Sequence, residues 1–390
     1  MTPALSPRLS PRDLLDRLVS FPTVSHATNL PLVDWVEGYL ASHGIASHRQ
    51  WHADGTKAAL FAHVGPAEAG GVVLSGHTDV VPVEGQAWSS DPWTVEERDG
   101  RLYGRGTCDM KGFDALAIWA LVEAHSRGVL RPLQLALSYD EEIGCTGAPP
   151  MIAAMQAVLP KAASAIIGEP SRMRAVNGHK GGAGYRVHVK GFEVHSSLLP
   201  SGVSAIMEAA RLIMWANARN AENAAKPAGP LAALFDPPFT TLHIGLIQGG
   251  TAQNITAADC TYSMEFRVVP GENPADWNAA FEAEAARLRS KIKAVRPEAD
   301  VILTPYFDVP PLRPEDGGTA EALVRRLTGD NATHVVSYGT EAGQFQDAGY
   351  SAVVCGPGDI AQAHQVDEYL EMSEFQAGQA FMEKLLTELA

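Results

Sequence analysis

Apolar and polar positions follow two different patterns along this chain, and the pattern changes near Gly181. In the first part, helical spacing of apolar residues predicts helices at 13–19, 31–43, 113–125 and 146–158. Short apolar runs predict buried strands at 57–64, 71–75, 133–138 and 162–168. Strands that alternate with helices are typical of a three-layer α/β domain, so we expect a mostly parallel mixed sheet.

After Gly181 the chain alternates strictly between apolar and polar residues over 185–191, as a strand with one solvent-facing side does. The following segments predict a helix at 203–217, strands at 239–247 and 258–268, a helix at 274–295 and a strand at 300–306. This β-α-β-β-α-β order is that of a ferredoxin-like α+β domain. The only linker-like stretch is 219–238, which is rich in proline and alanine over its second half.

The α/β pattern resumes near Val309, with helices predicted at 318–328, 341–348 and 373–389 and strands at 332–337 and 351–355. A chain of 390 residues is long for one hydrophobic core, so two domains are expected. We therefore predict a discontinuous α/β domain, residues 1–182 and 307–390, with a smaller α+β domain inserted at 183–306.

Composition excludes several classes of partner. A formal net charge of -15 argues against nucleic acid and anionic membranes as partners. No stretch is apolar enough for a signal peptide core or a membrane span, so we expect a cytoplasmic protein. Scattered cysteines without a CxxC motif indicate free thiols in a reducing compartment. Cys108 and Cys145 lie beside acidic clusters and are alternative soft metal ligands, although packing is the favoured role.

Five residues of metal-ligand type stand where a predicted strand ends or a glycine-rich loop begins: His77, Asp109, Glu142, Glu169 and His364. Carboxylate and imidazole together suit zinc, cobalt or manganese. Three carboxylates on one rim are costly without cations, and Asp109 can bridge two ions as in two-metal hydrolytic sites. Taken singly, each acid is more often a solvated loop or cap residue, and His364 more often an exposed or hydrogen-bonded histidine.

Two further residues complete the candidate site. Glu141 precedes Glu142, and neighbouring side chains diverge, so the two are not expected to bind the same ion. A carboxylate beside a metal-activated water is the general base that hydrolysis requires. Asp79 follows His77 by two residues and can orient its imidazole.

The chain resembles a known family. The segments 75–82, 104–112, 140–142, 168–170 and 363–370 are similar to the motifs of the M20 metallopeptidase and deacylase family, and they span nearly the whole chain. Within the family, 179–206, 338–345 and 355–371 are most similar to the acetylornithine deacetylases. The run Thr340-Glu341-Ala342 differs from the Thr-Ser-Asp run of succinyl-diaminopimelate desuccinylases.

The resemblance implies two divalent metal ions, with zinc favoured and cobalt as the alternative. His77 and Glu169 would bind one ion, Glu142 and His364 the other, and Asp109 both. Glu141 would be the general acid and base, and Asp79 would orient His77. The peptide bond between Asp109 and Met110 is expected to be cis.

The resemblance also implies that the inserted domain is a dimerisation or lid domain and that the protein is a homodimer. His195 would reach across the dimer to stabilise the oxyanion, although the sequence alone favours a helix-start residue. Asn254, Arg267, Gly339 and Thr340 would bind the substrate, with a sheet-end salt bridge as the alternative role of Arg267. No acid is assigned to the ammonium group of ornithine; the candidates are Glu341 and Asp359.

The predicted function is a metal-dependent amidohydrolase that removes the N-acetyl group of N2-acetyl-L-ornithine, giving L-ornithine and acetate in arginine biosynthesis. The nucleophile would be a metal-bridged water. Alternatives are another activity of the same family, namely a succinyl-diaminopimelate desuccinylase, a broad N-acyl-amino-acid amidohydrolase or a dipeptidase. A non-catalytic metal-binding protein is a further alternative, which the presence of Glu141 argues against.

Overall fold

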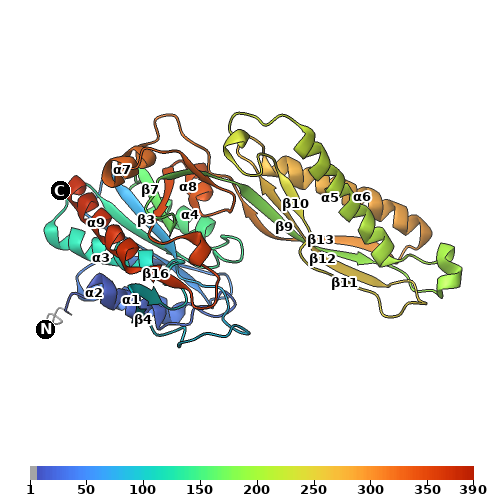
Figure 1. The fold of residues 1–390 in the computed structure, drawn as a ribbon, viewed down its shortest axis with the longest axis horizontal. Coiled ribbons are helices and arrows are strands. Elements are labelled where there is room, and N and C mark those ends of the chain that lie inside the picture. Colours follow the sequence, from blue (N-terminus) through green and yellow to red (C-terminus); the bar gives the residue numbers. More distant parts are fainter. Residues whose placement is uncertain (1–6) are drawn as a thin grey trace. The chain divides into compact units, whose positions relative to one another are not determined.

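The computed structural model describes residues 7–390, and the chain forms two compact units (Figure 1). Unit 1 contains the chain up to Gly178, Pro314–His334 and Thr340–Ala390. Unit 2 contains His179–Arg313 and the short returning segment Val335–Gly339. The sequence pattern placed the insertion at 183–306 and did not predict the returning segment.

Unit 1 is the α/β part. Its helices are α1 (Pro11–Val19), α2 (Leu30–Ser42), α3 (Lys111–Arg127), α4 (Ala148–Val158), α7 (Thr319–Thr328), α8 (Ala342–Asp347) and α9 (Met372–Leu389). Its main sheet consists of β1 (Ser47–Trp51), β2 (Ala58–Val64), β3 (Val72–His77), β6 (Leu133–Ser138), β7 (Ser164–Pro170), β8 (Val176–His179, whose last residue belongs to unit 2), β14 (His334–Val336, whose last two residues belong to unit 2) and β15 (Ser351–Gly356).

The strand order of the main sheet is β1-β2-β6-β3-β7-β15-β8-β14. Its centre is parallel, because β3 pairs in parallel with both β6 and β7, and β15 pairs in parallel with β7. The outer pairs β1–β2, β2–β6 and β15–β8 are antiparallel. The predicted fold class, a mixed sheet with a parallel core, is confirmed.

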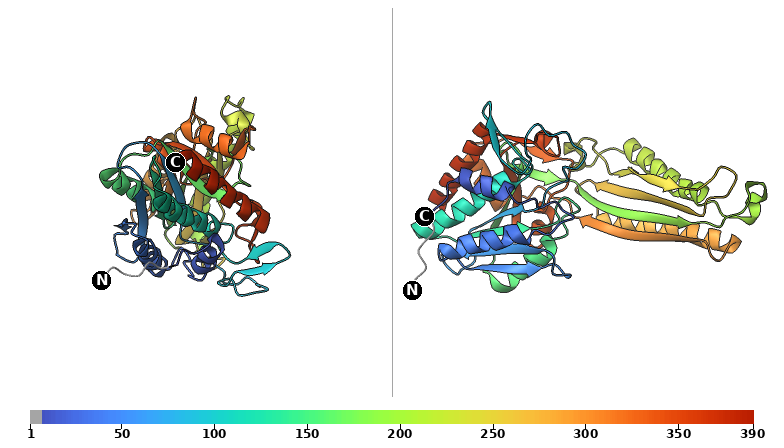
Figure 2. Two further views of the ribbon diagram at one scale, coloured as in Figure 1. Left: turned by 90° about the vertical axis from the view of Figure 1, so that its left-hand side faces the viewer. Right: turned by 90° about the horizontal axis from the view of Figure 1, so that it is seen from below.

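One face of this sheet carries the large hydrophobic core. Apolar side chains of α1, α2, α3, α7 and α9 form a single buried cluster with alternate residues of β2 and β6, among them Leu60, Leu135 and Leu137. The intervening residues of β2 face the opposite side, as the two-residue period of a strand requires. Figure 2 shows the same unit from two further directions.

Local signals explain the ends of the helices. Ser10 caps α1 by accepting a hydrogen bond from the Asp13 main chain, and the Asp13 carboxylate accepts one from the Ser10 main chain in return. Helix α3 ends at Gly128, whose φ of 69° is the left-handed conformation that glycine adopts readily.

Unit 2 is the α+β part. It contains β9 (Gly181–Lys190), η1 (Ser196–Ser201), α5 (Ala205–Ala225), η2 (Ala232–Leu234), β10 (Thr241–His243), β11 (Ile247–Gly249), β12 (Asp259–Val268), α6 (Pro274–Val295) and β13 (Asp300–Val309). The order β10-β12-β9-β13, with β11 also paired to β12, is antiparallel throughout. The predicted ferredoxin-like order of elements is present, with the second strand divided.

Several elements differ from the sequence prediction. Helix α5 continues to Ala225, so the first part of the predicted linker 219–238 is helical, and the predicted strand 239–247 divides into β10 and β11. The pattern missed β1 and β8, and also the small sheet of β4 (Glu96–Arg98), β5 (Arg101–Tyr103) and β16 (Tyr369–Glu371). These strands are short or polar, so their pairing depends on tertiary contacts that periodicity does not report.

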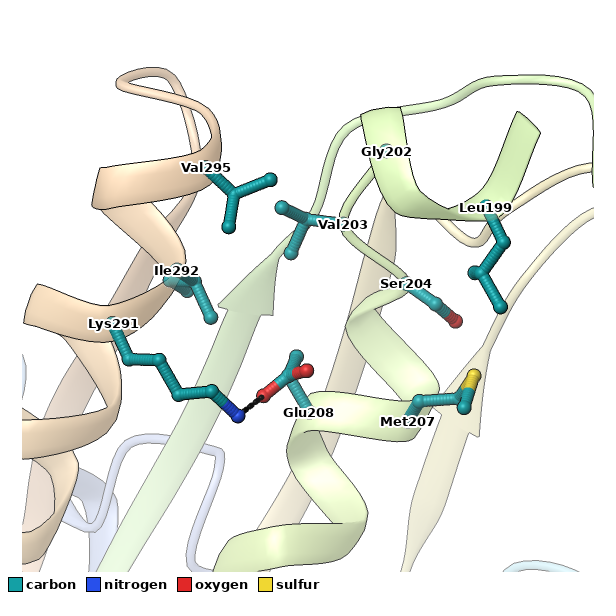
Figure 3. A pocket seen from close by; sticks show the side chains of 9 residues that line it. All are labelled: Leu199, Gly202, Val203, Ser204, Met207, Glu208, Lys291, Ile292 and Val295. Carbon is teal, nitrogen blue, oxygen red and sulfur yellow. Dashed lines mark ion pairs between the residues drawn. The ribbon is translucent and has the colours of Figure 1, made fainter.

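A small hollow lies in unit 2 between η1, α5 and α6 (Figure 3). Its lining is mostly aliphatic, and its two charged residues, Glu208 and Lys291, face each other at 3.8 Å. It therefore offers no unpaired charge to a ligand. Within residues 7–390, none of the helices combines the length and the apolar composition needed to cross a membrane.

Candidate metal centre

The candidate ligands gather because the central parallel strands of unit 1 end at one edge of the sheet. His77 is the last residue of β3, and Glu169 is the penultimate residue of β7. Glu142 follows β6, in the loop before α4, and Asp109 lies two residues before the start of α3. His364 comes from the loop after β15. In open α/β sheets this edge is where ligands bind.

Asp109 lies at the centre of the cluster, and its two oxygens face different partners. Asp109 Oδ1 is 3.1 Å from His77 Nε2, which is also 3.6 Å from Glu169 Oε1. Asp109 Oδ2 is 3.3 Å from His364 Nε2, which is 2.9 Å from Glu142 Oε2. The cluster therefore has two halves that share one carboxylate.

The electrostatics of this cluster favour bound cations. Burial and the charge of Asp109 raise the pKa of Glu142 to about 8 and that of Glu169 well above its ordinary value. Hydrogen bonds to Asp109 and Glu142 raise the pKa of His364 to about 10. Each of these shifts means that added positive charge is stabilised here.

Two carboxylate oxygens in the cluster lack a protein donor. Within residues 7–390, Glu142 Oε1 and Glu169 Oε1 are buried and accept no hydrogen bond. Buried oxygens of this kind are costly unless they are satisfied, and a divalent ion does so. Ligand atoms of His77, Asp109 and Glu142 all lie within 4.8 Å of one another, as do those of His77, Glu141 and Glu169. The residues present fit hard or borderline divalent metal ions.

His77 is oriented by Asp79, although through a different atom from the one expected. The Nδ1 atom of His77 lies 2.9 Å from the main-chain carbonyl of Asp79, whereas the Asp79 carboxylate is 3.7 Å away. Donation from Nδ1 to this carbonyl leaves Nε2 free for a metal. The Asp79 carboxylate instead accepts the main-chain N–H groups of Glu141 and Glu142, at 3.1 and 3.3 Å.

Glu141 sits beside the first half of the cluster. Its Oε2 is 4.0 Å from His77 Nε2, and its Oε1 accepts a hydrogen bond from the Cys145 thiol at 3.1 Å. Burial raises the pKa of Glu141 to about 7. A general base with a pKa near neutrality is well matched to proton transfer at physiological pH.

The sequence reasoning missed Glu368, which holds the Asp109 loop. Its carboxylate accepts the main-chain N–H groups of Gly106, Cys108 and Asp109 at 2.9–3.1 Å. It also accepts a bond from Arg105 at 2.7 Å, in an ion pair that is almost completely buried. Glu368 follows His364 by four residues, so the same segment supplies a candidate ligand and a support for Asp109. The motif 363–370 contained this signal, but only contacts reveal its role.

A second missed pair supports the loop of Glu141 and Glu142. The Lys57 ammonium donates to the carboxylate of Asp140 and to the main-chain carbonyl of Ser25, and all three residues are buried. Nothing in the sequence near Lys57 indicates a role in this loop.

The remaining predicted residues lie elsewhere. His195 and Asn254 are close together in unit 2, since the Ser196 N–H donates to the Asn254 carbonyl at 2.9 Å and His195 forms a bridge with Ile255. Arg267 is near the opposite end of β12, 3.4 Å from Glu265. Gly339 ends the returning segment of unit 2, and Thr340 is buried in unit 1.

The two residues considered as partners of the ornithine ammonium group both have other partners within unit 1. Glu341 is buried, and its carboxylate accepts bonds from the hydroxyl groups of Ser138 and Ser75. The Asp359 carboxylate faces Arg172 and caps η3 (Ile360–Gln362). These contacts argue against either residue as the group that recognises a substrate cation.

Comparison with known proteins identifies the family. Residues 73–388 match the family described as Peptidase family M20/M25/M40. This chain belongs to that family. It is therefore a hydrolase that acts on amide bonds, and its cluster of ligand-type residues supports a metal-dependent amidohydrolase.

Curated relatives of this M20 chain are similar over most of its length. It is 36% identical over 376 residues to an acetylornithine deacetylase from Myxococcus xanthus, covering 93% of each chain. It is 33% identical over 317 residues to the acetylornithine deacetylase of Proteus mirabilis, covering 81% of this chain and 79% of that one.

Solved structures share its fold. An M20 family metallo-carboxypeptidase from Sulfolobus solfataricus matches with a TM-score of 0.78 at 15% identity, covering 97% of this chain and 98% of that one. A dinuclear metal-binding peptidase of the same family from Bacillus subtilis matches with a TM-score of 0.62 at 15% identity, covering 97% of each.

Proposed function

We propose that this chain is a two-metal hydrolase that removes the acetyl group of N2-acetyl-L-ornithine, giving L-ornithine and acetate in arginine biosynthesis. The observation that carries the proposal is the division of the Asp109 carboxylate between two half-sites, with Glu141 beside one of them. The choice of substrate is supported by the curated relatives, which are named acetylornithine deacetylases.

In this proposal His77 and Glu169 would hold one ion, His364 and Glu142 the other, and Asp109 both. Two divalent ions, with zinc favoured and cobalt as the alternative, would supply Lewis acidity toward the acyl carbonyl and lower the pKa of water. Glu141 accepts the proton of the attacking water as the new C–O bond forms. Glu141 then returns this proton to the amine nitrogen as the C–N bond breaks.

The substrate contacts are assigned by resemblance. Arg267 can bind a carboxylate through two parallel hydrogen bonds, with main-chain groups of Gly339 and Thr340 contributing to the same site. Asn254 would likewise bind the amide or the carboxylate of the substrate, and His195 would stabilise the developing oxyanion.

The internal geometry of unit 2 supports a contribution from two copies of the chain. Arg267 lies eight positions along β12 from Asp259. Since a strand rises about 3.3 Å per residue, the two residues are about 26 Å apart. The pairing of Gly191 with Ala258 and of Phe192 and Val194 with Thr256 continues the sheet beyond Asp259, toward His195. A small amino acid cannot contact both His195 and Arg267 of one copy, so we propose that the partner subunit's His195 completes the site.

Exposed apolar residues in unit 2 supply a surface for this homodimer. All three residues of strand β11 are exposed at the sheet edge, and the strand pairs only with β12 among the described strands. Leu246 and Ile247 are 76% and 55% exposed, and Met207 and Met214 of α5 are exposed as well. Exposed apolar groups beside an unpaired strand edge are typical of protein–protein contacts.

The proposal is tested by amide hydrolysis after reconstitution with zinc or cobalt. N2-acetyl-L-ornithine, N-succinyl-diaminopimelate and N-acetyl-L-methionine are compared side by side, using wild type and Glu141→Ala. We expect a preference in kcat/KM for acetylornithine and a loss of about 10²–10⁴-fold in Glu141→Ala.

Two other outcomes would change the proposal. Equal rates on the three substrates would leave the mechanism in place and make the protein a broad N-acyl-amino-acid amidohydrolase. No hydrolysis of any of them by metal-loaded wild type would contradict the proposed substrate class.

A further inference from the structure

The thiol of Cys145 makes a contact that the mechanism has not used. Cys145 is buried, and its Sγ lies 3.1 Å from Oε1 of Glu141. The other carboxylate oxygen, Oε2, is the one directed toward His77. The thiol therefore touches the general base on the side away from the metal-ligand cluster.

The backbone around Cys145 holds this contact in place. The Gly144 and Cys145 N–H groups both donate to the Glu141 carbonyl at 2.9 Å, and the Thr146 N–H donates to the Asp140 carbonyl at 3.2 Å. From helix α8, the Gln344 side-chain amide donates to the Cys145 carbonyl at 3.1 Å. The turn is thus anchored at both of its ends and from a separate element.

The conformation of Cys145 is unusual for a residue with a side chain. Its φ is 54°, in the left-handed region that glycine adopts at no steric cost. A side chain in such a position calls for a function, since strain of this kind persists where the surroundings over-determine it. The contact with Glu141 supplies that function.

The thiol is a suitable donor at this position. Burial and the nearby charge of Glu141 raise the pKa of Cys145 well above its ordinary value, so the sulfur keeps its proton. A neutral S–H group can donate to a carboxylate, whereas a thiolate would repel it. The other three cysteines, Cys108, Cys260 and Cys355, are also buried.

We infer that Cys145 is a positioning residue for the general base: its thiol holds Oε1 of Glu141, so that Oε2 faces the reacting water. This inference rests on the proposed function, because it assigns Glu141 the proton transfer. In this role Cys145 acts through Glu141 and not by direct contact with the substrate.

The kinetic test compares Cys145→Ala, Cys145→Ser and the control Cys260→Ala, which removes a buried thiol from unit 2. In Cys145→Ala we expect kcat on N2-acetyl-L-ornithine to fall about tenfold, as for loss of a hydrogen bond to a charged group, with KM within about twofold. The serine variant keeps a donor and should recover most of kcat. Calorimetric titration with zinc should give unchanged stoichiometry in all variants.

Three results would overturn the inference: Cys145→Ala with wild-type kcat, Cys145→Ser as slow as Cys145→Ala, or a loss of zinc binding in parallel with kcat. The last would show a general disturbance of the site. Cys260→Ala should keep wild-type kcat. If its kcat falls as much as that of Cys145→Ala, the fall in kcat is not specific to the contact between Cys145 and Glu141, and the inference is also overturned.

A spectroscopic test does not require turnover. The difference between the infrared spectra of wild type and Cys145→Ser isolates the S–H stretching band of Cys145. A hydrogen bond to a carboxylate should place this band at lower frequency than the band isolated with Cys260→Ser, and Glu141→Ala should move it up. If wild type hydrolyses none of the three substrates, the proposed function fails, and the contact is then judged on this band alone: an unshifted band overturns it.

Discussion

At the scale of single residues, the site depends on carboxylates that are wholly or largely buried. Asp109 is held from behind by Glu368, which uses both of its oxygens on three main-chain N–H groups and Arg105. A buried carboxylate with this many donors gives Asp109 a fixed position from which its own two oxygens can face opposite ways. The identity of the ligand-type residues was accessible from the sequence, because each stands after a predicted strand or in a glycine-rich loop. The role of Glu368 was not, because it consists of contacts over about 260 positions.

Replacing Glu368 should therefore destabilise unit 1. In Glu368→Gln one partner of the buried Arg105 ion pair is lost, and breaking such a pair costs about 3–5 kcal/mol. Urea unfolding of the metal-loaded protein measures this change. The exposed pairs of Glu388 with Arg131 and Arg326 provide the control, and Glu388→Gln should cost about 1 kcal/mol or less. Equal effects of the two variants would contradict this prediction.

Two buried acids outside the ligand set should make metal-free protein less stable as pH rises. Burial raises the pKa of Asp114 from 3.8 to about 8 and that of Glu341 from 4.5 to about 7. The folded state then holds protons that the unfolded chain has released, so each acid contributes a loss of stability of about 1.4 kcal/mol per pH unit between pH 5 and 7. Above pH 7 the lowered pKa of Lys111, about 7, acts in the opposite direction.

Unfolding by urea in the presence of a chelator, at pH 5 and pH 7, measures this effect. Asp114→Asn should reduce the loss of stability between the two pH values by about 2.5–3 kcal/mol, and Glu341→Gln should reduce it by a smaller amount. A wild-type pH dependence in both variants would show that these acids are ionised in the folded protein.

At the scale of elements, the two edges of the unit 2 sheet differ in what they expose. Strand β11 leaves one edge open, beside the apolar side chains of Leu246 and Ile247. Strand β13 forms the other edge and is longer, with Ile302 exposed to 39%. If β11 is part of the dimer contact, a charge there should separate the subunits while the same charge on β13 should not.

The matched variants are Ile247→Lys and Ile302→Lys. We expect Ile247→Lys to elute as a monomer in size-exclusion chromatography and to lose activity, because the partner subunit's His195 is then absent. Ile302→Lys should remain dimeric and active. A dimeric, active Ile247→Lys would place the interface elsewhere.

The sequence predicted long, strongly periodic elements well and short ones poorly. Helix α6 was predicted at its observed bounds, because its apolar positions recur at helical spacing over 22 residues. Strand β1, Ser47–Trp51, is mostly polar, and its pairing with β2 stabilises it in a way that its own residues do not indicate. Helix α5 extends into the first part of the predicted linker because the alanines near its end are strong helix formers.

At the scale of the whole molecule, the separation between His195 and Arg267 in unit 2 predicts that the active site is shared. Mixing two inactive variants under conditions that exchange subunits tests this. In a His195→Ala and Glu141→Ala heterodimer, one site combines an intact Glu141 with an intact His195. Random exchange in a closed dimer should restore roughly a quarter of wild-type activity.

If both residues act within one copy, the mixture stays inactive. As a control, mixing Glu141→Ala with His364→Ala should restore no activity, since both residues lie in unit 1 and no combination of subunits then provides an intact metal-binding unit beside an intact Glu141.

The discontinuity of unit 1 also bears on how the protein is made. Ribosomes deliver the chain from its N-terminus, and domains generally fold as units during synthesis. Asp109 and Glu142 are therefore made well before His364 and Glu368, with all of the inserted segment between them. A nascent chain that has completed the inserted unit still lacks both the histidine of the second half-site and the carboxylate that holds Asp109. We therefore expect an unfinished chain to be inactive in amide hydrolysis. The acidic cluster is complete only after His364 and Glu368 have been synthesised.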